Sequence, residues 1–177
     1  LVLGALAPVV FVSRADVQDW PLIGGLARAS GTLFLERERK RQLPATVAAM
    51  RAWIDRGVLL VFFPEGTSGR GDVVMPFRSS LFEVAVLARA TVYAAAIDYR
   101  TAPGDAPADE AVCWWDDTGF AAHAWKLLRT RRVDARVAFH ATPIEADDRK
   151  TMARHAEDAV RARFRPSAPA DPEGAVR

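Results

Sequence analysis

Short apolar segments recur along the chain at lengths typical of β-strands. The first three, 8–13, 32–35 and 58–63, are mostly β-branched or aliphatic, which favours strands. The third is apolar at every position and therefore predicts a strand that is covered on both faces. Three more strands are predicted further along the chain, at 91–99, 111–115 and 133–139.

Segments with helical spacing lie between these strands. One helix is predicted by apolar residues at every third or fourth position, Leu43, Val47, Met50 and Ile54, and Gly57 ends it. The segment 147–164 is amphipathic, and its predicted inner face consists of Met152, Ala156, Ala159, Val160 and Phe164. Further helices are predicted at 21–29, 79–89 and 119–128.

This alternation of strands and helices predicts an α/β fold with a mixed, largely parallel sheet flanked by helices. Ligands in such folds bind at the loops that follow the carboxyl ends of strands, so chemistry is expected after Leu35 and after Phe63. A length of 177 residues suits one domain, which we expect over 1–165. The segment 166–177 is rich in Pro, Ala and Gly and is predicted to be a disordered tail.

Composition excludes several classes of protein. Half of the residues are hydrophobic and 26% are charged, so the chain is not of the disordered class, and a net charge of +2 is too small to indicate nucleic-acid binding. Cys113 is the only cysteine, which excludes an internal disulfide framework. The three histidines, His123, His140 and His155, lie far apart in the sequence, and no metal site is predicted.

The first segment with candidate chemistry is Gly31-Thr32-Leu33-Phe34-Leu35-Glu36-Arg37. The predicted strand ends here and delivers Glu36 and Arg37 to the rim of the sheet. One interpretation is a charged helix start exposed to water. The other is that Arg37 binds an anionic group, because a guanidinium pairs bidentately with phosphate or carboxylate.

The second segment is the loop after Phe63, which begins Pro64-Glu65-Gly66-Thr67-Ser68. Glycine allows backbone N–H groups to approach a phosphate closely, and the two hydroxyls add donors. A carboxylate repels phosphate, so two other roles are open to Glu65: accepting backbone N–H bonds to hold the loop, or accepting a hydrogen bond from a substrate hydroxyl. The Gly-Lys-Ser/Thr ending of a Walker loop is missing.

Together, and in this order, the two segments resemble motifs of the glycerolipid acyltransferases, the family that includes the 1-acyl-sn-glycerol-3-phosphate acyltransferases. The segment from Gly31 to Arg37 resembles the second motif of that family, whose arginine binds the acceptor's phosphate. The sequence Phe63-Pro64-Glu65-Gly66-Thr67 resembles the third, which belongs to the acceptor site. Two departures are Ser68, where the third motif often continues with arginine, and the lack of a proline between Thr91 and Tyr99.

The resemblance implies substrate-binding roles for residues of both motifs: Gly31, Phe34, Glu36, Arg37, Pro64, Glu65, Gly66, Thr67 and Ser68. It implies transfer of a fatty acyl group from acyl-CoA or acyl carrier protein to the hydroxyl of a lysolipid, without metal or prosthetic group. The expected acceptor is 1-acyl-sn-glycerol-3-phosphate and the product phosphatidic acid, and lyso-ornithine lipid is the alternative acceptor. The implied location is the cytoplasmic face of a bacterial inner membrane.

The family's catalytic motif, His followed by four residues and Asp, is absent from this chain. In the family the histidine is the general base and the aspartate orients it. The chain opens at Leu1 rather than at a methionine, so we expect the motif just before Leu1 and expect these residues alone to be inactive. The alternatives are a lipid-binding module without a base and an unrelated α/β phosphate-binding enzyme.

The membrane is an expected partner, but the sequence leaves the contact surface open. The basic cluster Arg129, Arg131 and Arg132 follows a predicted amphipathic helix. It suits either anionic lipid headgroups or a solvated helix end. The apolar opening 1–12 is too short to span a bilayer and suits either the bilayer surface or the core.

Overall fold

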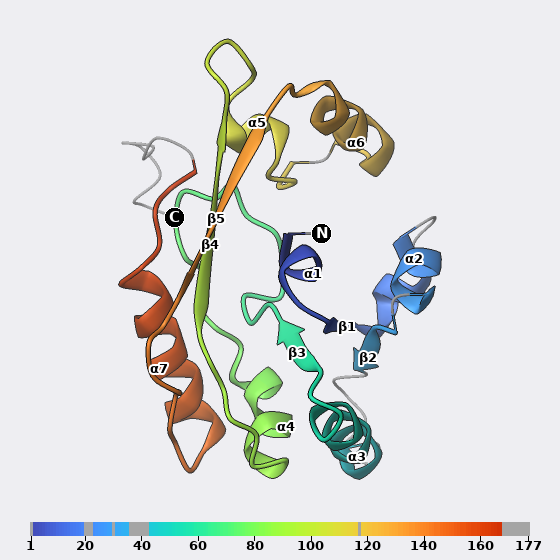
Figure 1. Cartoon of the computed structure of the whole chain (residues 1–177), viewed down its shortest axis with the longest axis vertical. Coiled ribbons are helices and arrows are strands. Elements are labelled where there is room, and N and C mark those ends of the chain that lie inside the picture. Colours follow the sequence, from blue (N-terminus) through green and yellow to red (C-terminus); the bar gives the residue numbers. More distant parts are fainter. Residues whose placement is uncertain (1, 20–22, 30, 36–42, 117, 168–177) are drawn as a thin grey trace. The chain divides into compact units, whose positions relative to one another are not determined.

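A computed structural model describes residues 2–19, 23–29, 31–35, 43–116 and 118–167 (Figure 1). The chain divides into two compact units, which we describe separately. The first unit consists of Leu1–Pro64, Arg78–Val92 and Glu145–Ala153. The second consists of Glu65–Phe77, Tyr93–Ile144 and Arg154–Arg177.

The first unit contains a parallel sheet of three strands in the order β2-β1-β3. The strands are β1 (Val9–Arg14), β2 (Leu33–Leu35) and β3 (Leu59–Phe62). Val12 of the central strand lies opposite both Leu33 and Phe62. All three strands therefore run in the same direction and end at the same edge, which confirms the predicted parallel α/β arrangement.

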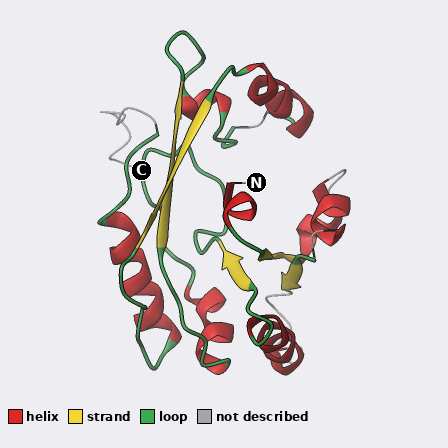
Figure 2. Ribbon diagram, viewed as in Figure 1, coloured by secondary structure: helices red, strands yellow, loops and turns green. Residues whose placement is uncertain are grey.

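Helices flank this sheet (Figure 2). They are α1 (Val2–Leu6), η1 (Ala15–Asp19), α2 (Ile23–Ala29), α3 (Leu43–Ile54), η3 (Ser79–Leu81) and α4 (Phe82–Leu87). The core contains Val10, Val12, Met50 and Phe82, all less than 9% exposed. The ring of Phe62 on β3 packs edge-on against Phe82 at 5.1 Å between centroids.

The expectation that β3 is covered on both faces is wrong at Leu59, whose side chain is 56% exposed. This strand is an edge strand of the three-stranded sheet, and Leu59 is its first residue. An apolar run alone does not distinguish a central strand from an edge strand.

A glycine ends α3 and directs the chain into β3. Gly57 has φ +74, and its N–H donates to the Ile54 carbonyl at 2.8 Å while the Val58 N–H donates to the Trp53 carbonyl at 3.1 Å. This pair of bonds is a Schellman motif, which favours glycine because other residues are strained in the left-handed region. Arg89 ends α4 in the same way at φ 48.

The second unit contains an antiparallel pair of strands, β4 (Ala95–Thr101) and β5 (Val133–Phe139), which run side by side in Figure 2. Asp98 lies opposite Arg136 in this pair. The Asp98 carboxylate, 5% exposed, accepts a hydrogen bond from the Arg136 guanidinium at 2.6 Å. The charge on this buried carboxylate is thus compensated across the strands.

The predicted strand at 111–115 is wrong. Ala111 is the last residue of the short helix α5 (Ala108–Ala111), and the strand paired with β4 is β5. Pro107 precedes the helix, and Asp109 and Glu110 lie in its first turn. Acidic residues at a helix start are favourable because of the helix dipole.

The two remaining helices match their predictions. They are α6 (Phe120–Arg129) and α7 (Arg149–Arg161). The predicted inner residues Met152, Ala156, Ala159 and Val160 of α7 are buried, and Phe164 follows the end of the helix.

The start of the predicted tail is attached to the second unit at Ser167. Its N–H donates to the Gly71 carbonyl at 2.7 Å, and its hydroxyl oxygen accepts a bond from the Tyr99 N–H at 2.9 Å. Residues 168–177 lie outside the described residues.

Candidate functional site

The candidate site begins at the edge where the parallel strands end. The chain leaves β2 after Leu35 and leaves β3 after Phe62, and Arg14, the last residue of β1, lies opposite Leu35. The topology therefore brings the points where the chain leaves β2 and β3 to one edge of the sheet, as expected for an α/β ligand site. Glu36 and Arg37 themselves lie outside the described residues.

Gly31 has a structural role that the sequence interpretation did not assign. It has φ +72 and its N–H donates to the Arg28 carbonyl at 3.1 Å, while the Thr32 N–H donates to the Ala27 carbonyl at 3.0 Å. This is again a Schellman motif, which ends α2 and directs the chain into β2. Phe34 lies in β2 opposite Ser13 and is half-buried.

The loop after β3 is closed at its base by a backbone bond. The Pro64 carbonyl accepts a hydrogen bond from the Arg78 N–H at 2.8 Å. The preceding residue, Phe63, is 55% exposed, and its ring stacks on Phe11 of β1 with 6.4 Å between centroids. The segment from Pro64 to Arg78 is therefore a closed loop rather than an open linker.

Within the second unit, Glu65 holds the loop from inside. Its carboxylate accepts a hydrogen bond from the Met75 backbone N–H. Burial raises the pKa of Glu65 above its ordinary value of 4.5, the Met75 bond and the charge of Arg161 lower it, and the charge of Glu157 raises it. Two roles were considered for Glu65, and the structure shows the first: its carboxylate accepts a backbone N–H bond within the loop. The contact with a substrate hydroxyl stays a prediction.

Glu157 of α7 holds the same loop two residues further on. Its carboxylate accepts the Phe77 N–H at 2.8 Å and pairs with Arg161 one turn along the helix, at 2.8 Å. Sequence reasoning missed Glu157, because it lies 80 positions from Phe77 and no local pattern connects the two.

Gly66, Thr67 and Ser68 form the outer part of the loop. Gly66 has φ +71, in the region that favours glycine. Both hydroxyl residues are exposed, and within the described residues the only bond given by either hydroxyl is a long one of 3.4 Å, from Thr67 to the Ser68 carbonyl. These side chains are therefore available to solvent.

Arg70 is held by an acidic residue on α5. Its Nε donates to the Asp109 carboxylate at 2.9 Å, and that side chain is only 4% exposed. The guanidinium also lies 5.6 Å from the centre of the Trp115 ring, within the range of a cation–π contact. The function of Asp109 is not visible in the sequence, because 39 positions separate it from Arg70.

The comparisons with known proteins show the family. The sequence model of the family described as Acyltransferase matches residues 1–98, which is more than half of the chain. The chain belongs to the acyltransferase family. Both motif segments lie within the matched residues, and the resemblance noted in the sequence is confirmed.

Several curated acyltransferases are similar to this chain. A lyso-ornithine lipid O-acyltransferase from Rhodobacter capsulatus is 38% identical, over 90% of this chain and 59% of its own length. Another from Pseudomonas aeruginosa is 36% identical, over 90% of this chain and 60% of its own. A 1-acyl-sn-glycerol-3-phosphate acyltransferase from Neisseria meningitidis is 28% identical, over 90% of this chain and 62% of its own length. The chain thus spans about three fifths of the length of these relatives.

One solved structure shares the fold. The 1-acyl-sn-glycerophosphate (LPA) acyltransferase PlsC from Thermotoga maritima superposes with a TM-score of 0.55 at 17% identity, over 92% of this chain and 58% of that one. This match confirms the predicted fold class of the acyltransferase chain.

The three histidines of the acyltransferase chain lie in different parts of the structure and have different neighbours. His123 is 8% exposed and stacks on Trp114 with 6.1 Å between ring centroids. His140 Nδ1 lies 3.0 Å from the Thr142 carbonyl, and His155 is exposed on α7. None is followed by an aspartate five positions later.

Within the described parts of the chain, no helix is both long and apolar enough to cross a bilayer. The same residues include no group of three or more His, Cys, Asp or Glu side chains arranged to hold a metal ion.

The raised pKa of Glu65 leads to a prediction about stability. Because the pKa of Glu65 is higher in the folded state, the folded chain releases this proton at a higher pH than the unfolded chain does. The free energy of unfolding therefore falls as the pH rises through the folded pKa. Glu65→Gln keeps an acceptor for the Met75 N–H and removes the charge. We therefore expect it to raise the free energy of unfolding at pH 7.

Urea denaturation of both proteins at pH 4 and pH 7 measures this effect. The difference in the free energy of unfolding between variant and parent should be small at pH 4 and should increase toward pH 7. Glu110→Gln, at an exposed carboxylate on α5, controls for the loss of one charge. A Glu65→Gln protein that is less stable than the parent at pH 7 contradicts the account.

Proposed function

We propose that the protein transfers a fatty acyl group from a thioester, acyl-CoA or acyl carrier protein, to the free hydroxyl of a lysolipid. The observation that carries this proposal is the family match over residues 1–98, which includes both motif segments. The named relatives all act on lysolipids, which supports this class of acceptor.

The two candidate acceptors differ in their anionic group. The lyso-ornithine lipid enzymes are 38% and 36% identical to this chain, against 28% for the lysophosphatidate enzyme. A single arginine pairs bidentately with a carboxylate as well as with a phosphate. Ser68 stands where the third motif often has a second arginine, and an ornithine carboxylate needs less positive charge than a phosphate monoester. We therefore favour lyso-ornithine lipid, with 1-acyl-sn-glycerol-3-phosphate as the second candidate.

We assign the roles as follows. Arg37 binds the anionic group of the acceptor, and the loop that contains Glu65, Gly66 and Thr67 shapes the acceptor pocket. Two findings support this assignment: β2 and β3 end at one edge of the sheet, and Glu65 and Glu157 fix the loop at Met75 and Phe77. Gly31, Phe34, Glu36, Pro64 and Ser68 complete the proposed site.

The chemistry requires a base that these residues do not contain. In the proposed mechanism, the histidine of a His-x4-Asp pair takes the proton of the acceptor hydroxyl, and the oxygen attacks the thioester carbonyl. The carbon–sulfur bond then breaks, and the thiol leaves with a proton. No metal or prosthetic group takes part. The chain has no such pair, so the proposed mechanism requires a base that these 177 residues do not supply.

The location follows from the substrates. Lysolipid acceptors reside in membranes, and the named relatives are bacterial. We propose that the protein acts on the cytoplasmic face of a bacterial inner membrane.

Product analysis with both acceptors tests the proposed function. The full-length protein is incubated with acyl-CoA, or with acyl carrier protein loaded with the same chain, and with either lysolipid at equal concentration. Mass spectrometry identifies the acylated product. We expect acylation of lyso-ornithine lipid to proceed with a higher kcat/KM than acylation of 1-acyl-sn-glycerol-3-phosphate. The reverse order reverses the acceptor assignment, and no product from either acceptor contradicts the proposal.

A further inference from the structure

The helix α6 exposes large apolar side chains on its outer face. Leu128 is 77% exposed and Trp125 is 62% exposed, and the two are three positions apart, so they are neighbours on the helix. The other face is held within its unit: His123 stacks on Trp114, and Phe120 packs edge-on against the same ring at 5.7 Å. Two large apolar side chains together in water are unfavourable and indicate a contact surface.

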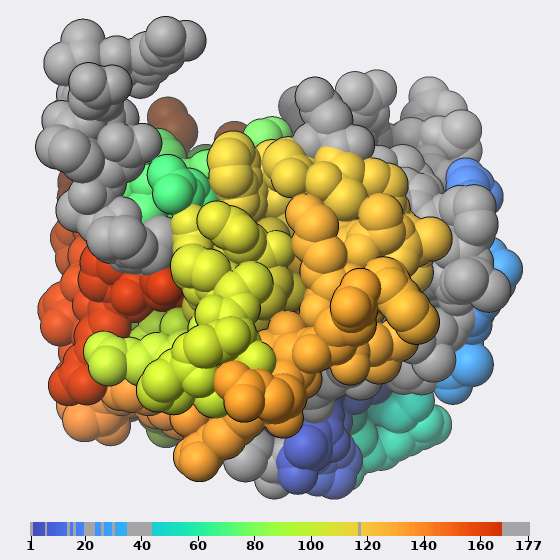
Figure 3. Space-filling view, turned by 90° about the horizontal axis from the view of Figure 1, so that it is seen from above, coloured from blue at the N-terminus to red at the C-terminus, as the bar shows by residue number. Residues whose placement is uncertain are grey.

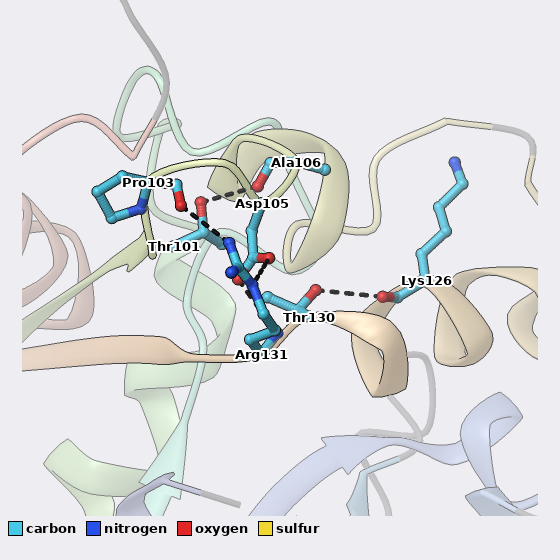
Figure 4. Close-up of polar contacts among 7 residues, drawn as sticks. All are labelled: Thr101, Pro103, Asp105, Ala106, Lys126, Thr130 and Arg131. Atoms are coloured by element: carbon cyan, nitrogen blue, oxygen red, sulfur yellow. Dashed lines mark hydrogen bonds and ion pairs between the residues drawn. The ribbon is translucent and has the colours of Figure 1, made fainter.

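Two basic residues border these apolar side chains. Lys126 and Arg129 each follow one of them directly in sequence, and both are exposed. Within the part of the chain that the structure describes, the Arg129 side chain has no hydrogen bond or ion pair. The lysine charge acts on Asp116, whose pKa is lowered first by hydrogen bonds from Thr118 and then by Lys126. Figure 4 shows the Lys126 side chain extending away from Arg131.

The other two arginines of the basic cluster predicted from the sequence are engaged within the protein. Arg131 donates to the Asp105 carboxylate at 2.8 Å and to the Pro103 carbonyl at 2.9 Å (Figure 4). Arg132 pairs with Asp134 at 2.8 Å. The Arg131 bonds attach the residues that follow α6 to the segment between β4 and α5.

We propose that Trp125, Lys126, Leu128 and Arg129, the α6 surface, bind an anionic lipid bilayer. Apolar side chains beside basic ones on a short helix suit the boundary between headgroups and acyl chains, and tryptophan is favoured at that boundary. The positive charges complement anionic headgroups. The choice of a bilayer as the occupant rests on the proposed lipid acceptor. In Figure 3 the amber atoms of α6 lie at the surface seen from above.

Vesicle flotation of the full-length protein tests the α6 surface. Phosphatidylglycerol–phosphatidylcholine vesicles are compared with phosphatidylcholine vesicles at several salt concentrations. We expect Lys126→Ser/Arg129→Ser to bind the anionic vesicles about tenfold more weakly and with a smaller salt dependence, and Trp125→Ala/Leu128→Ala to bind them about tenfold more weakly. Leu87→Ser and Arg154→Ser, at exposed residues of α4 and α7, are the matched controls and should bind as the parent does.

A second readout reports on Trp125 directly, whatever other parts of the protein touch the membrane. Lipids with brominated acyl chains quench tryptophan fluorescence only near the bilayer. We expect Trp125→Phe to reduce the amount of emission that is quenched per protein molecule, whereas Trp53→Phe, at a half-buried tryptophan of α3, should leave that amount unchanged. Equal quenching in Trp125→Phe and in the parent overturns the proposal.

Two further outcomes separate this inference from competing accounts. If the α6 variants bind vesicles like the parent but lose a concentration-dependent self-association, the surface is an interface between two copies of the chain, and the proposal is overturned. Acyl transfer to lysolipid dispersed in detergent micelles reports on the proposed function alone. The α6 variants should retain that activity, and its absence from a parent that binds vesicles counts against the proposed function and not against the α6 surface.

Discussion

Replacement of Gly24 by alanine is expected to destabilise the protein by about 3 kcal/mol or more, or to prevent folding. A Cβ at this position would lie 2.0 Å from the carbonyl oxygen of Gln18 and 2.6 Å from its carbonyl carbon. These are backbone atoms of η1, so no side-chain rotation relieves the overlap, and α2 must move away from η1. The same carbonyl accepts a hydrogen bond from the Arg28 guanidinium at 2.6 Å, which the shift would also disturb.

The adjacent glycine provides the matched control. Gly25 lies in the same helix, and a Cβ there meets nothing within 4 Å. Since alanine favours a helix over glycine by about 1 kcal/mol, Gly25→Ala should stabilise the protein by roughly 0.5–1 kcal/mol. Chemical denaturation of the two variants measures both effects. Equal stability of the two variants would show that α2 does not approach η1 as closely as described.

The loss of Arg37 is expected to lower kcat/KM for acyl transfer by about 100-fold without changing stability. Under the proposed function, this guanidinium forms a charge-assisted, bidentate pair with the acceptor, and its removal leaves the anionic group without a partner. Arg37→Lys keeps the charge but loses the fork-shaped donors, so it should recover only part of the activity. Steady-state kinetics of the full-length enzyme with varied acceptor concentration measure these changes.

Other charges in the same segment provide the control for Arg37. Arg39 and Arg41 belong to the same basic run, and their alanine variants should change kcat/KM by less than about threefold. Thermal unfolding of each variant shows whether the fold is intact. If turnover of Arg37→Ala equals that of the parent, Arg37 is only part of a charged, solvent-exposed segment.

The fold was predictable where the pattern depends on neighbours in sequence. The strands of the parallel sheet, the helix α3 with its end at Gly57, and α7 with its buried face follow from periodicity and glycine placement. The segment 111–115 was not predictable in this way, because a short apolar run suits several structures. In the structure this segment begins with Ala111, the last residue of the helix α5 that starts after Pro107, and it does not pair as a strand.

The candidate site was predictable only in part, for a similar reason. Glu65 was identified from its motif, and one of its two possible roles is present as the bond to Met75. The residues that hold the loop, Glu157 and Asp109, come from distant parts of the sequence, and nothing local indicates them. For Gly31 the structure adds a role. The resemblance assigns this motif glycine to the acceptor site, and in the structure it also ends the helix α2.

The central claim is that the protein transfers an acyl group to a lysolipid, and acceptor-dependent thiol release tests it most directly. The full-length protein is mixed with acyl-CoA or acyl carrier protein thioester, and free thiol is followed with and without lysolipid. The account predicts thiol release that requires the lysolipid and equals the acylated product mole for mole. Thiol release of the same rate without lysolipid would indicate a thioesterase. Binding of lysolipid without any thiol release would indicate a non-catalytic module, and either result contradicts the account.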